Sequence, residues 1–356
     1  MSSFIPLVAI LFFSINYLMV ALSGKFLAAF LQKIGFTQFI REEGPASHKH
    51  KQFTPTTGGI IFTSVVFTVP IGLLLWSLFL SFSKSTNQLS LQPINLALNP
   101  CNLLLAFVLL ASAAIGFWDD YLKKVKRQNE GLRPKQKLSA QIILSLILSV
   151  ALQRTSTNFF DLIELKLGFL LFAVFVFLVL AGSMNAVNLT DGLDGLAASI
   201  LGWSYLGLAG LLVWLKGSID LQSICSLTWC LALAGVCFGF LRINGHPAKV
   251  FMGDTGSFLL GGTLAAIALV NGLEWYLLLL AIVPIWETVS VLLQVLSCKL
   301  SKRFLGKDWR PFRMSPFHHH LEMCGWSETK TVWVLSSIQA IFSFLTVLFF
   351  ALKTIL

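Results

Sequence analysis

The sequence has little charge. Only 12% of its 356 residues are Asp, Glu, Lys or Arg, about half of the ~25% usual in a soluble domain, while 56% are hydrophobic. This composition argues against a disordered chain and, despite a net charge of +10, against a nucleic-acid-coating protein. The six cysteines form no Cys-x-x-Cys pair and most lie in apolar stretches, which is typical of small buried side chains rather than of a disulfide framework.

Charge is absent from ten long stretches, one of them interrupted only by Glu287. They are 1–24, 52–83, 85–118, 138–153, 167–190, 195–215, 221–241, 255–273, 275–298 and 331–352. A bilayer core ~30 Å thick is crossed by about 20 apolar residues in a helix, so each stretch can hold one span. The first has no basic residue before Lys25 and no small-x-small cleavage site, so we expect a retained helix. The sequence therefore predicts an all-α, polytopic integral membrane protein with about ten transmembrane helices in a single domain, 1–356.

The few charges are unevenly placed. Ten spans divide the connecting loops into two sets, and one set holds 21 of the 26 Lys and Arg residues, 11 of the 16 acids and all six histidines. The positive-inside rule places that set in the cytoplasm, so we expect both termini on the non-cytoplasmic side. A transporter should carry polar groups along a path through the membrane, but only Glu287 is clearly intramembrane. An enzyme with a water-soluble substrate from the cytoplasm fits better.

Asn185, Asn188, Asp191 and Asp194 recur every third residue where a span meets the cytoplasm. Steps of three keep neighbours on one helix face, and amide and carboxylate oxygens suit a hard cation. The spacing is not that of an EF-hand. The alternative is a set of solvated helix caps.

Asp119 and Asp120 end the third span and precede a basic run that includes Lys123 and Lys137. Adjacent helical residues point ~100° apart, so one carboxylate could face the substrate and the other the supporting structure. The positive-inside rule alone explains the basic run, to which phosphate binding can be added.

Asp254 lies between Gly253 and Gly256 at the start of the eighth span. Glycine lets backbone N–H groups approach a phosphate, and a helix N-terminus favours an anion. We expect a metal-phosphate role for Asp254, with a plain N-cap as the alternative.

His318, His319 and His320 lie in the longest basic loop. Consecutive side chains on a helix or strand point in different directions, so we expect them to meet nucleotide or phosphate groups individually, unless the triplet is exposed and unused. The loop at 48–59, rich in hydroxyls and glycine, is a weaker signal.

Together these motifs resemble the polyprenyl-phosphate N-acetylhexosamine-1-phosphate transferase superfamily. The motifs that match are Asp119-Asp120, Asn188-Leu-Thr-Asp191-Gly-Leu-Asp194-Gly and Gly253-Asp254-Thr-Gly-Ser. Met314-x-Pro316-x-His318-His-His320 and Thr54-Pro55-Thr56-x-Gly-Gly point to its phospho-N-acetylmuramoyl-pentapeptide transferase branch. The likeness covers nearly the whole chain.

The resemblance implies a ten-helix fold whose active site faces the cytoplasm at the inner (plasma) membrane, built from loops near 41–59, 116–137, 183–195, 242–257 and 299–328. It also implies a Mg²⁺-dependent reaction in which UDP-MurNAc-pentapeptide and undecaprenyl phosphate give lipid I and UMP, the first membrane step of peptidoglycan synthesis. The expected partners are these two substrates and the bilayer, with no nucleic acid; a homodimer is left open.

Residue roles follow from the same resemblance. The expected catalytic residues are Asp119, Asp120, Asp254 and His318. The expected Mg²⁺ ligands are Asp254, Asp191 and Asp194. The expected substrate-binding residues are Lys51, Thr56, Lys123, Lys137, Asn185, Asn188, Asn244, Phe251, His319 and His320. Asp119 would take the proton of the lipid phosphate or act as a nucleophile, and Glu287 with its helix would form one wall of an apolar groove for the lipid tail.

The chain departs from the usual branch pattern at Phe53, Thr57 and Arg242-Ile243, which affects loop conformation but leaves the acidic positions intact. Three alternatives remain. A transferase that uses UDP-GlcNAc or another HexNAc donor is disfavoured by the histidine triplet, and a lipid or solute transporter by the one-sided charge. An inactive scaffold would not need the full set of carboxylates.

Overall fold

The protein forms a bundle of long helices in the computed structural model, which describes residues 5–37, 54–82, 98–126, 131–153, 168–215 and 221–355. The elements are α1 (Ile5–Lys33), η2 (Gly58–Ser64), α2 (Val65–Phe82), α4 (Pro100–Lys126), α5 (Pro134–Gln153), α6 (Gly168–Thr190), α7 (Leu196–Leu215), α8 (Leu221–Asn244), α9 (Gly253–Asn271), η3 (Glu274–Tyr276), α10 (Leu277–Leu280), α11 (Ile282–Leu305), α12 (Phe317–Met323) and α13 (Glu328–Ile355). These described ranges contain no β-strand, and ten of their helices are long and apolar enough to cross a membrane. The predicted all-α, ten-span architecture is confirmed.

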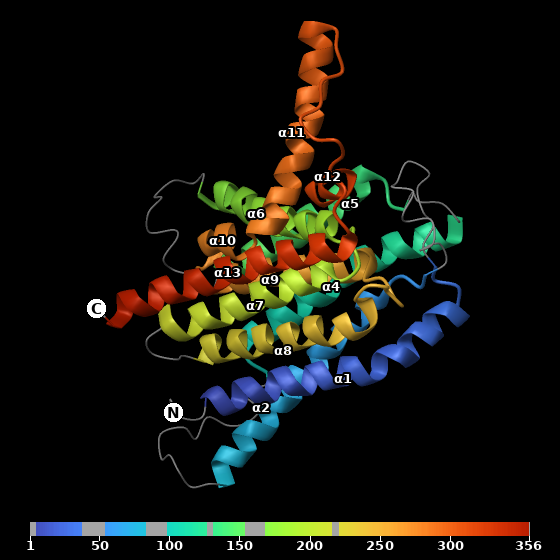
Figure 1. The fold of residues 1–356 in the computed structure, drawn as a ribbon. Coiled ribbons are helices and arrows are strands. Elements are labelled where there is room, and N and C mark those ends of the chain that lie inside the picture. The colour runs from blue at the N-terminus through green and yellow to red at the C-terminus, as the bar shows by residue number, and fades with distance from the viewer. Residues whose placement is uncertain are drawn as a thin grey trace.

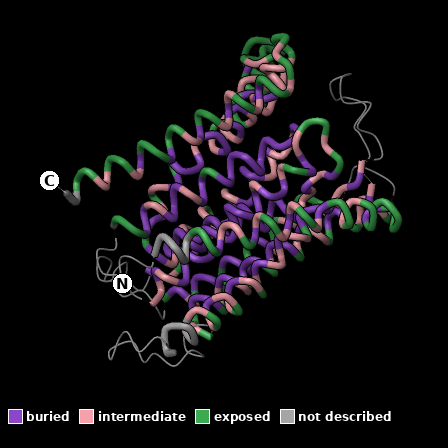
Figure 2. Tube along the Cα trace, turned by 60° about the horizontal axis from the view of Figure 1, so that its bottom comes forward, coloured by how far each residue is buried: buried purple, intermediate pink, exposed green. Residues whose placement is uncertain are grey.

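Helices α8 and α9 form the centre of the bundle. Both are mostly buried, and they pack against α1, α4, α6 and α7, whereas only about a quarter of the residues of α1 and α11 are buried. Figure 2 shows the buried residues gathered in the middle of the molecule. Small residues permit this packing: a Cβ on Gly239 of α8 would meet the carbonyl oxygen of Tyr17 in α1 at 2.6 Å. Backbones can therefore approach closely where side chains of ordinary size would hold the helices apart.

Helix α4 crosses the beginning of α9 just as closely. A Cβ on Gly116 would collide with the backbone of Asp254, and one on Gly59 would collide with Gly256. The segment before η2 is tied to the residues before α9 by hydrogen bonds from Gly58 N to Phe251 O and from Phe251 N to Pro55 O, at 2.9 and 2.7 Å. These contacts fix the end of α4 against the start of α9.

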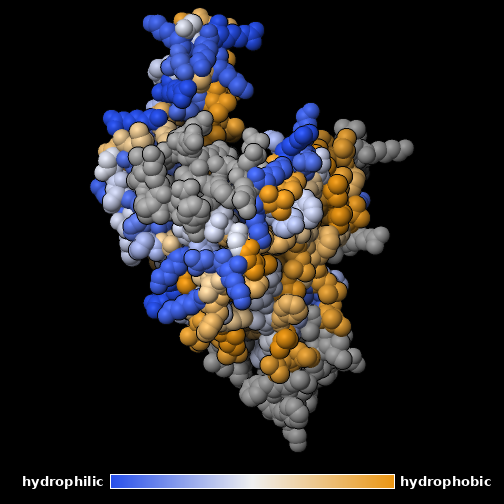
Figure 3. All heavy atoms as spheres, turned by 90° about the vertical axis from the view of Figure 1, so that its right-hand side faces the viewer, coloured by the Kyte–Doolittle hydropathy of each residue, from blue (hydrophilic) through white to orange (hydrophobic). Residues whose placement is uncertain are grey.

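Helix α11 projects from the bundle (Figure 1). Its outer half exposes Leu292, Leu296, Leu300 and Phe304, and hydrophilic side chains gather at its far end (Figure 3). Glu287, near its beginning, is fully buried. Its side chain therefore packs inside the bundle, and the expectation that its helix forms one wall of a groove for the lipid tail stays a prediction.

The N-terminal end of α1 and the C-terminal end of α13 lie at the same end of the bundle, and the α6–α7 turn, the α8–α9 loop and α12 lie at the other (Figure 1). Every described motif that the sequence singles out is at this second end.

Candidate active site

Asp120, near the end of α4, holds the start of α9. Its carboxylate accepts hydrogen bonds from the backbone N–H groups of Asp254 and Thr255, at 3.1 and 3.0 Å, and from the Thr255 hydroxyl at 2.7 Å. A carboxylate in this place satisfies free amides and complements the positive end of the helix dipole. The alternative that Asp254 is itself a plain N-cap is wrong, because Met252 occupies the N-cap position and Asp254 lies in the first turn.

Asp119 and Asp254 are bridged by two lysines. The ammonium of Lys123 lies 2.6 Å from Asp119 and 3.1 Å from Asp254, and that of Lys137 lies 3.0 and 2.8 Å from the same two carboxylates. The backbone N–H of Leu132 also donates to Asp119, at 2.7 Å. The helical spacing thus gives the adjacent acids different main partners: Asp120 supports α9, as predicted for one of the two, and Asp119 faces the lysines.

Helix α6 brings an amide to the same place. Asn188 donates to Asp254 Oδ1 at 2.9 Å and lies 3.0 Å from the Ser257 hydroxyl. Asn185 points elsewhere, toward Gln141 of α5. The prediction that Asn185, Asn188, Asp191 and Asp194 share one helix face is wrong, because α6 ends at Thr190 and the chain turns before α7.

Asp191 lies at the beginning of that turn. Burial, with the nearby carboxylates of Asp254 and Asp120, raises the pKa of Asp191 to about 8. A carboxyl in such surroundings retains a proton at neutral pH unless a cation approaches it.

This constellation suits a hard divalent cation. One oxygen from each of Asp119, Asp120 and Asp254 falls within 4.8 Å of the others. Since Asp120 is engaged by α9, the oxygens of Asp119 and Asp254 are better placed as ligands. The Lys123 and Lys137 side chains are 30% and 24% exposed, so they have room to move aside for a metal. We call Asp119, Asp120, Asp254, Lys123 and Lys137 the lysine-bridged cluster.

Asp194 belongs to a second group, the histidine clasp, formed with His246 and Glu328. His246 Nδ1 lies 3.1 Å from Asp194 Oδ2 and 3.4 Å from Glu328 Oε2. The backbone N–H groups of Ala248 and Asp194 donate to Asp194 and Glu328 respectively, at 3.0 and 2.7 Å. These contacts connect the α6–α7 turn, the α8–α9 loop and the start of α13.

Asn244 stabilises the same turn. Its side-chain oxygen accepts the N–H of Gly195 at 3.1 Å, and its amide donates to Val250 O at 2.9 Å. Both ends of this predicted substrate-binding side chain are therefore engaged within the protein.

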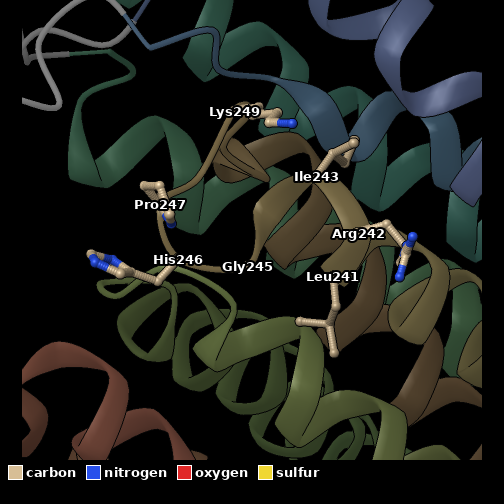
Figure 4. A pocket seen from close by; sticks show the side chains of 7 residues that line it. All are labelled: Leu241, Arg242, Ile243, Gly245, His246, Pro247 and Lys249. Atoms are coloured by element: carbon tan, nitrogen blue, oxygen red, sulfur yellow. The ribbon is translucent and has the colours of Figure 1, made fainter.

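A pocket of about 360 Å³ opens beside the end of α8 (Figure 4), lined by Leu241, Arg242, Ile243, Gly245, His246, Pro247 and Lys249. Its three basic side chains are exposed, and it adjoins the histidine clasp through His246.

The three consecutive histidines have different neighbours. His318 is fully buried against Glu287, at 3.2 Å from Nδ1 to Oε2. His319 Nδ1 lies 2.8 Å from Glu322 Oε2, and His320 Nδ1 accepts the N–H of Arg313 at 3.1 Å. The polar partners of the three rings thus differ, although the rings of His318 and His319 lie in contact with their centroids 4.2 Å apart.

Two further residues predicted to bind substrate, Thr56 and Phe251, lie in the segments that precede η2 and α9. Thr56 is partly buried, with its hydroxyl close to Gly253. The backbone of Phe251 forms hydrogen bonds with Pro55 and Gly58. Lys51 lies outside the described residues.

Sequence reasoning missed the contacts of His246, Glu328 and Glu287. Each is a single polar residue without a repeating neighbour, and each meets its partner across at least 31 positions of chain. The only signal available was the presence of Glu287 in an apolar span.

The chain is similar in sequence to known proteins. The family model described as glycosyl transferase family 4 matches residues 102–272. The phospho-N-acetylmuramoyl-pentapeptide-transferase of Shouchella clausii is 41% identical over 320 residues, covering 88% of this chain and 89% of its own. The proteins of the same name from a Geobacillus species and from Listeria monocytogenes are 38% and 37% identical, and each alignment covers 95% of this chain and at least 96% of theirs.

Proposed function

The chain belongs to the phospho-N-acetylmuramoyl-pentapeptide-transferase family, and on that premise we propose that it transfers phospho-MurNAc-pentapeptide from UDP-MurNAc-pentapeptide to undecaprenyl phosphate, giving lipid I and UMP. The observation that carries this proposal is the lysine-bridged cluster, in which two ammonium groups and two carboxylates converge at the end of a membrane-spanning helix. Phosphoryl transfer between two anions needs such charge compensation more than covalent assistance.

The charges of the cluster support an anionic substrate. Its three carboxylates and two lysines sum to one negative charge, and a bound Mg²⁺ would change the sum to one positive charge. Asp119 and Asp254, with Asp191 beside them, would hold the ion, which supplies Lewis-acid stabilisation of phosphate oxygens when bound. Lys123 and Lys137 then contact the substrate phosphates as they leave the carboxylates.

The transfer forms one bond and breaks another. An oxygen of the lipid phosphate attacks the sugar-linked phosphorus of the donor, the bond from that phosphorus to the bridging oxygen breaks, and UMP leaves with the electron pair. Asn188 fixes Asp254, and Asp120 fixes the α9 backbone, so the substrate meets a preorganised site. His318, His319, His320, Thr56, Phe251 and, beyond the described residues, Lys51 complete the proposed substrate contacts.

A direct displacement is favoured over an aspartyl intermediate. Asp119 is fully buried, and its Oδ1 accepts the Leu132 N–H at 2.7 Å, a contact that remains when the lysines move onto the phosphates, whereas a nucleophile needs an accessible carboxylate directed at phosphorus. Labelled UMP should therefore fail to exchange into the donor when the lipid acceptor is left out. Exchange at a rate comparable to turnover would establish the two-step path.

The donor assignment is tested by measuring UMP release from purified protein in detergent with undecaprenyl phosphate and Mg²⁺. We expect release with UDP-MurNAc-pentapeptide and at least about 100-fold less with UDP-GlcNAc, since a site built for polar groups rejects a donor that lacks them. The reverse preference would assign the chain to the HexNAc-1-phosphate branch.

In the same assay, Asp254→Asn tests whether the lysine-bridged cluster is needed for transfer. Asp308→Asn, a change at an exposed loop acid, is its matched control.

We place the active site at the cytoplasmic face of the plasma membrane, with both termini outside, because the basic loops gather at the end of the bundle that carries the cluster. A cysteine introduced at position 90 should react with a membrane-impermeant reagent in intact cells. Reaction only after the membrane is opened would reverse the orientation.

A further inference from the structure

Glu287 and His318 form a buried polar pair away from the lysine-bridged cluster. Both side chains are fully buried. Glu287 Oε2 accepts the backbone N–H of His318 at 3.2 Å and lies 3.2 Å from the ring nitrogen Nδ1. Within the described part of the chain, Glu287 Oε1 has no hydrogen-bond partner.

The other ring nitrogen faces the turn between α6 and α7. His318 Nε2 packs against Gly192, where a Cβ would collide with it, and Gly192 directly follows Asp191. Within the described ranges, neither ring nitrogen of His318 has a hydrogen-bond partner, so Nδ1 meets Glu287 Oε2 as a close electrostatic contact rather than as an aligned hydrogen bond. Buried nitrogens of this kind are rare, and each calls for an explanation such as a catalytic role or a bound group.

If the pair had a purely structural role, burying it would cost folding free energy without an evident gain. A carboxylate inside a membrane-spanning helix is expensive unless it is well compensated, and among the described residues only His318 makes polar contacts with the Glu287 side chain. Other contacts already fasten the segment that carries the histidines. Gln294 exchanges two hydrogen bonds with the backbone of Phe312, at 2.9 and 3.1 Å, and the rings of Trp286 and Phe317 pack with centroids 5.6 Å apart.

We propose that Glu287 is a positioning residue that orients the imidazole of His318, holding a proton on Nδ1 and presenting Nε2 to the substrate phosphates beside the Asp191–Gly192 turn. A carboxylate behind a histidine fixes both its tautomer and its direction. This inference rests on the proposed transfer reaction, in which His318 is the catalytic partner.

The first test is kinetic and uses the UMP-release assay at saturating Mg²⁺. Glu287→Leu should lower kcat about 100-fold and leave the donor KM within about threefold, because orientation is lost while binding groups remain. Glu287→Gln should restore kcat to within about tenfold of the original, since its amide oxygen can still accept a proton from Nδ1. Gln294→Leu, which loosens the same segment without touching His318, is the control for a structural effect.

A double-mutant cycle separates positioning from packing. In a His318→Gln background, Glu287→Leu should change kcat less than about threefold, whereas Gln294→Leu should cost the same factor as in the unmodified protein. An equal loss from Glu287→Leu with and without His318 would overturn the proposal, as would full activity of Glu287→Leu.

A second measurement needs no substrate and distinguishes failure of this proposal from failure of the proposed function. Nitrogen NMR of histidine-labelled protein in micelles, with His318 identified by its loss in His318→Gln, reports which ring nitrogen is protonated. We expect a proton on Nδ1 in the unmodified protein and loss of that preference in Glu287→Leu, with Glu287→Gln serving if the leucine variant does not fold. An unprotonated Nδ1 in the unmodified protein would contradict the proposal whatever the enzyme transfers.

Discussion

The lysine-bridged cluster and the histidine clasp contain similar ligands but differ in what compensates their carboxylates. Each offers three oxygen or nitrogen ligands within 4.8 Å. In the cluster, Asp119 and Asp254 face lysine side chains that are partly exposed. In the clasp, Asp194 and Glu328 accept backbone N–H groups. A lysine can swing away to admit a metal or a phosphate, whereas a backbone amide can leave only if its loop moves. The first arrangement therefore suits a reacting site and the second suits a structural connection.

The largest expected effect is that of Asp254→Asn. This change removes a carboxylate that both lysines and Asn188 contact, so kcat should fall at least about 10³-fold, the scale of losing a principal electrostatic group. In Asp194→Asn, kcat should fall far less. The comparison of the two clusters fails if UMP release in detergent shows equal losses for the two variants.

Lys137→Gln comes next. Losing one of two ammonium groups that would move onto the substrate phosphates should lower kcat/KM about 100-fold. Lys135→Gln, a neighbouring exposed lysine, is the matched control and should stay within about twofold. Equal effects at the two positions would assign the basic run to membrane topology alone.

Asp191 gives a pH-dependent effect of intermediate size. Its raised pKa of about 8, against an ordinary value near 4, means that in EDTA the folded protein should lose stability as pH rises between these values. Asp191→Asn should therefore raise the melting temperature by several degrees at pH 8 and have little effect at pH 5. A constant difference at both pH values, measured by thermal unfolding in detergent, would contradict this account.

Glu328→Gln should have the smallest effect. The amide oxygen can still accept the N–H of Asp194, so the clasp should remain closed and kcat should change less than about threefold. Glu328→Leu should instead lower the melting temperature, because it leaves that N–H without its partner. A loss of 100-fold or more in kcat for Glu328→Gln would mean that the clasp takes part in the reaction.

The sequence predicts the helices better than the contacts between them. Charge-free stretches locate the ten spans because the requirement to cross an apolar layer acts on each helix separately. The divergence of Asp119 and Asp120 is also predictable, since it depends only on helical geometry. The end of α6 at Thr190 is not, because the three-residue spacing continues through the turn at Asp191 and Gly192.

Long-range contacts depend on how helices pack, which single-residue patterns do not encode. Asp194 meets Glu328 across 134 positions, and Lys137 meets Asp254 across 117. Glu287 is conspicuous in sequence as the one acid in its span, but only the folded bundle shows that it faces His318.

Binding of Mn²⁺ as a spectroscopic substitute for Mg²⁺ tests the central claim most directly. Electron paramagnetic resonance of the purified protein, titrated with Mn²⁺ in detergent, counts bound ions without requiring turnover. The account predicts one ion whose affinity falls at least about 100-fold in Asp254→Asn and changes less than about threefold in Glu328→Gln. Loss of that ion in Glu328→Gln with full binding in Asp254→Asn would contradict the assignment of the lysine-bridged cluster as the reacting site.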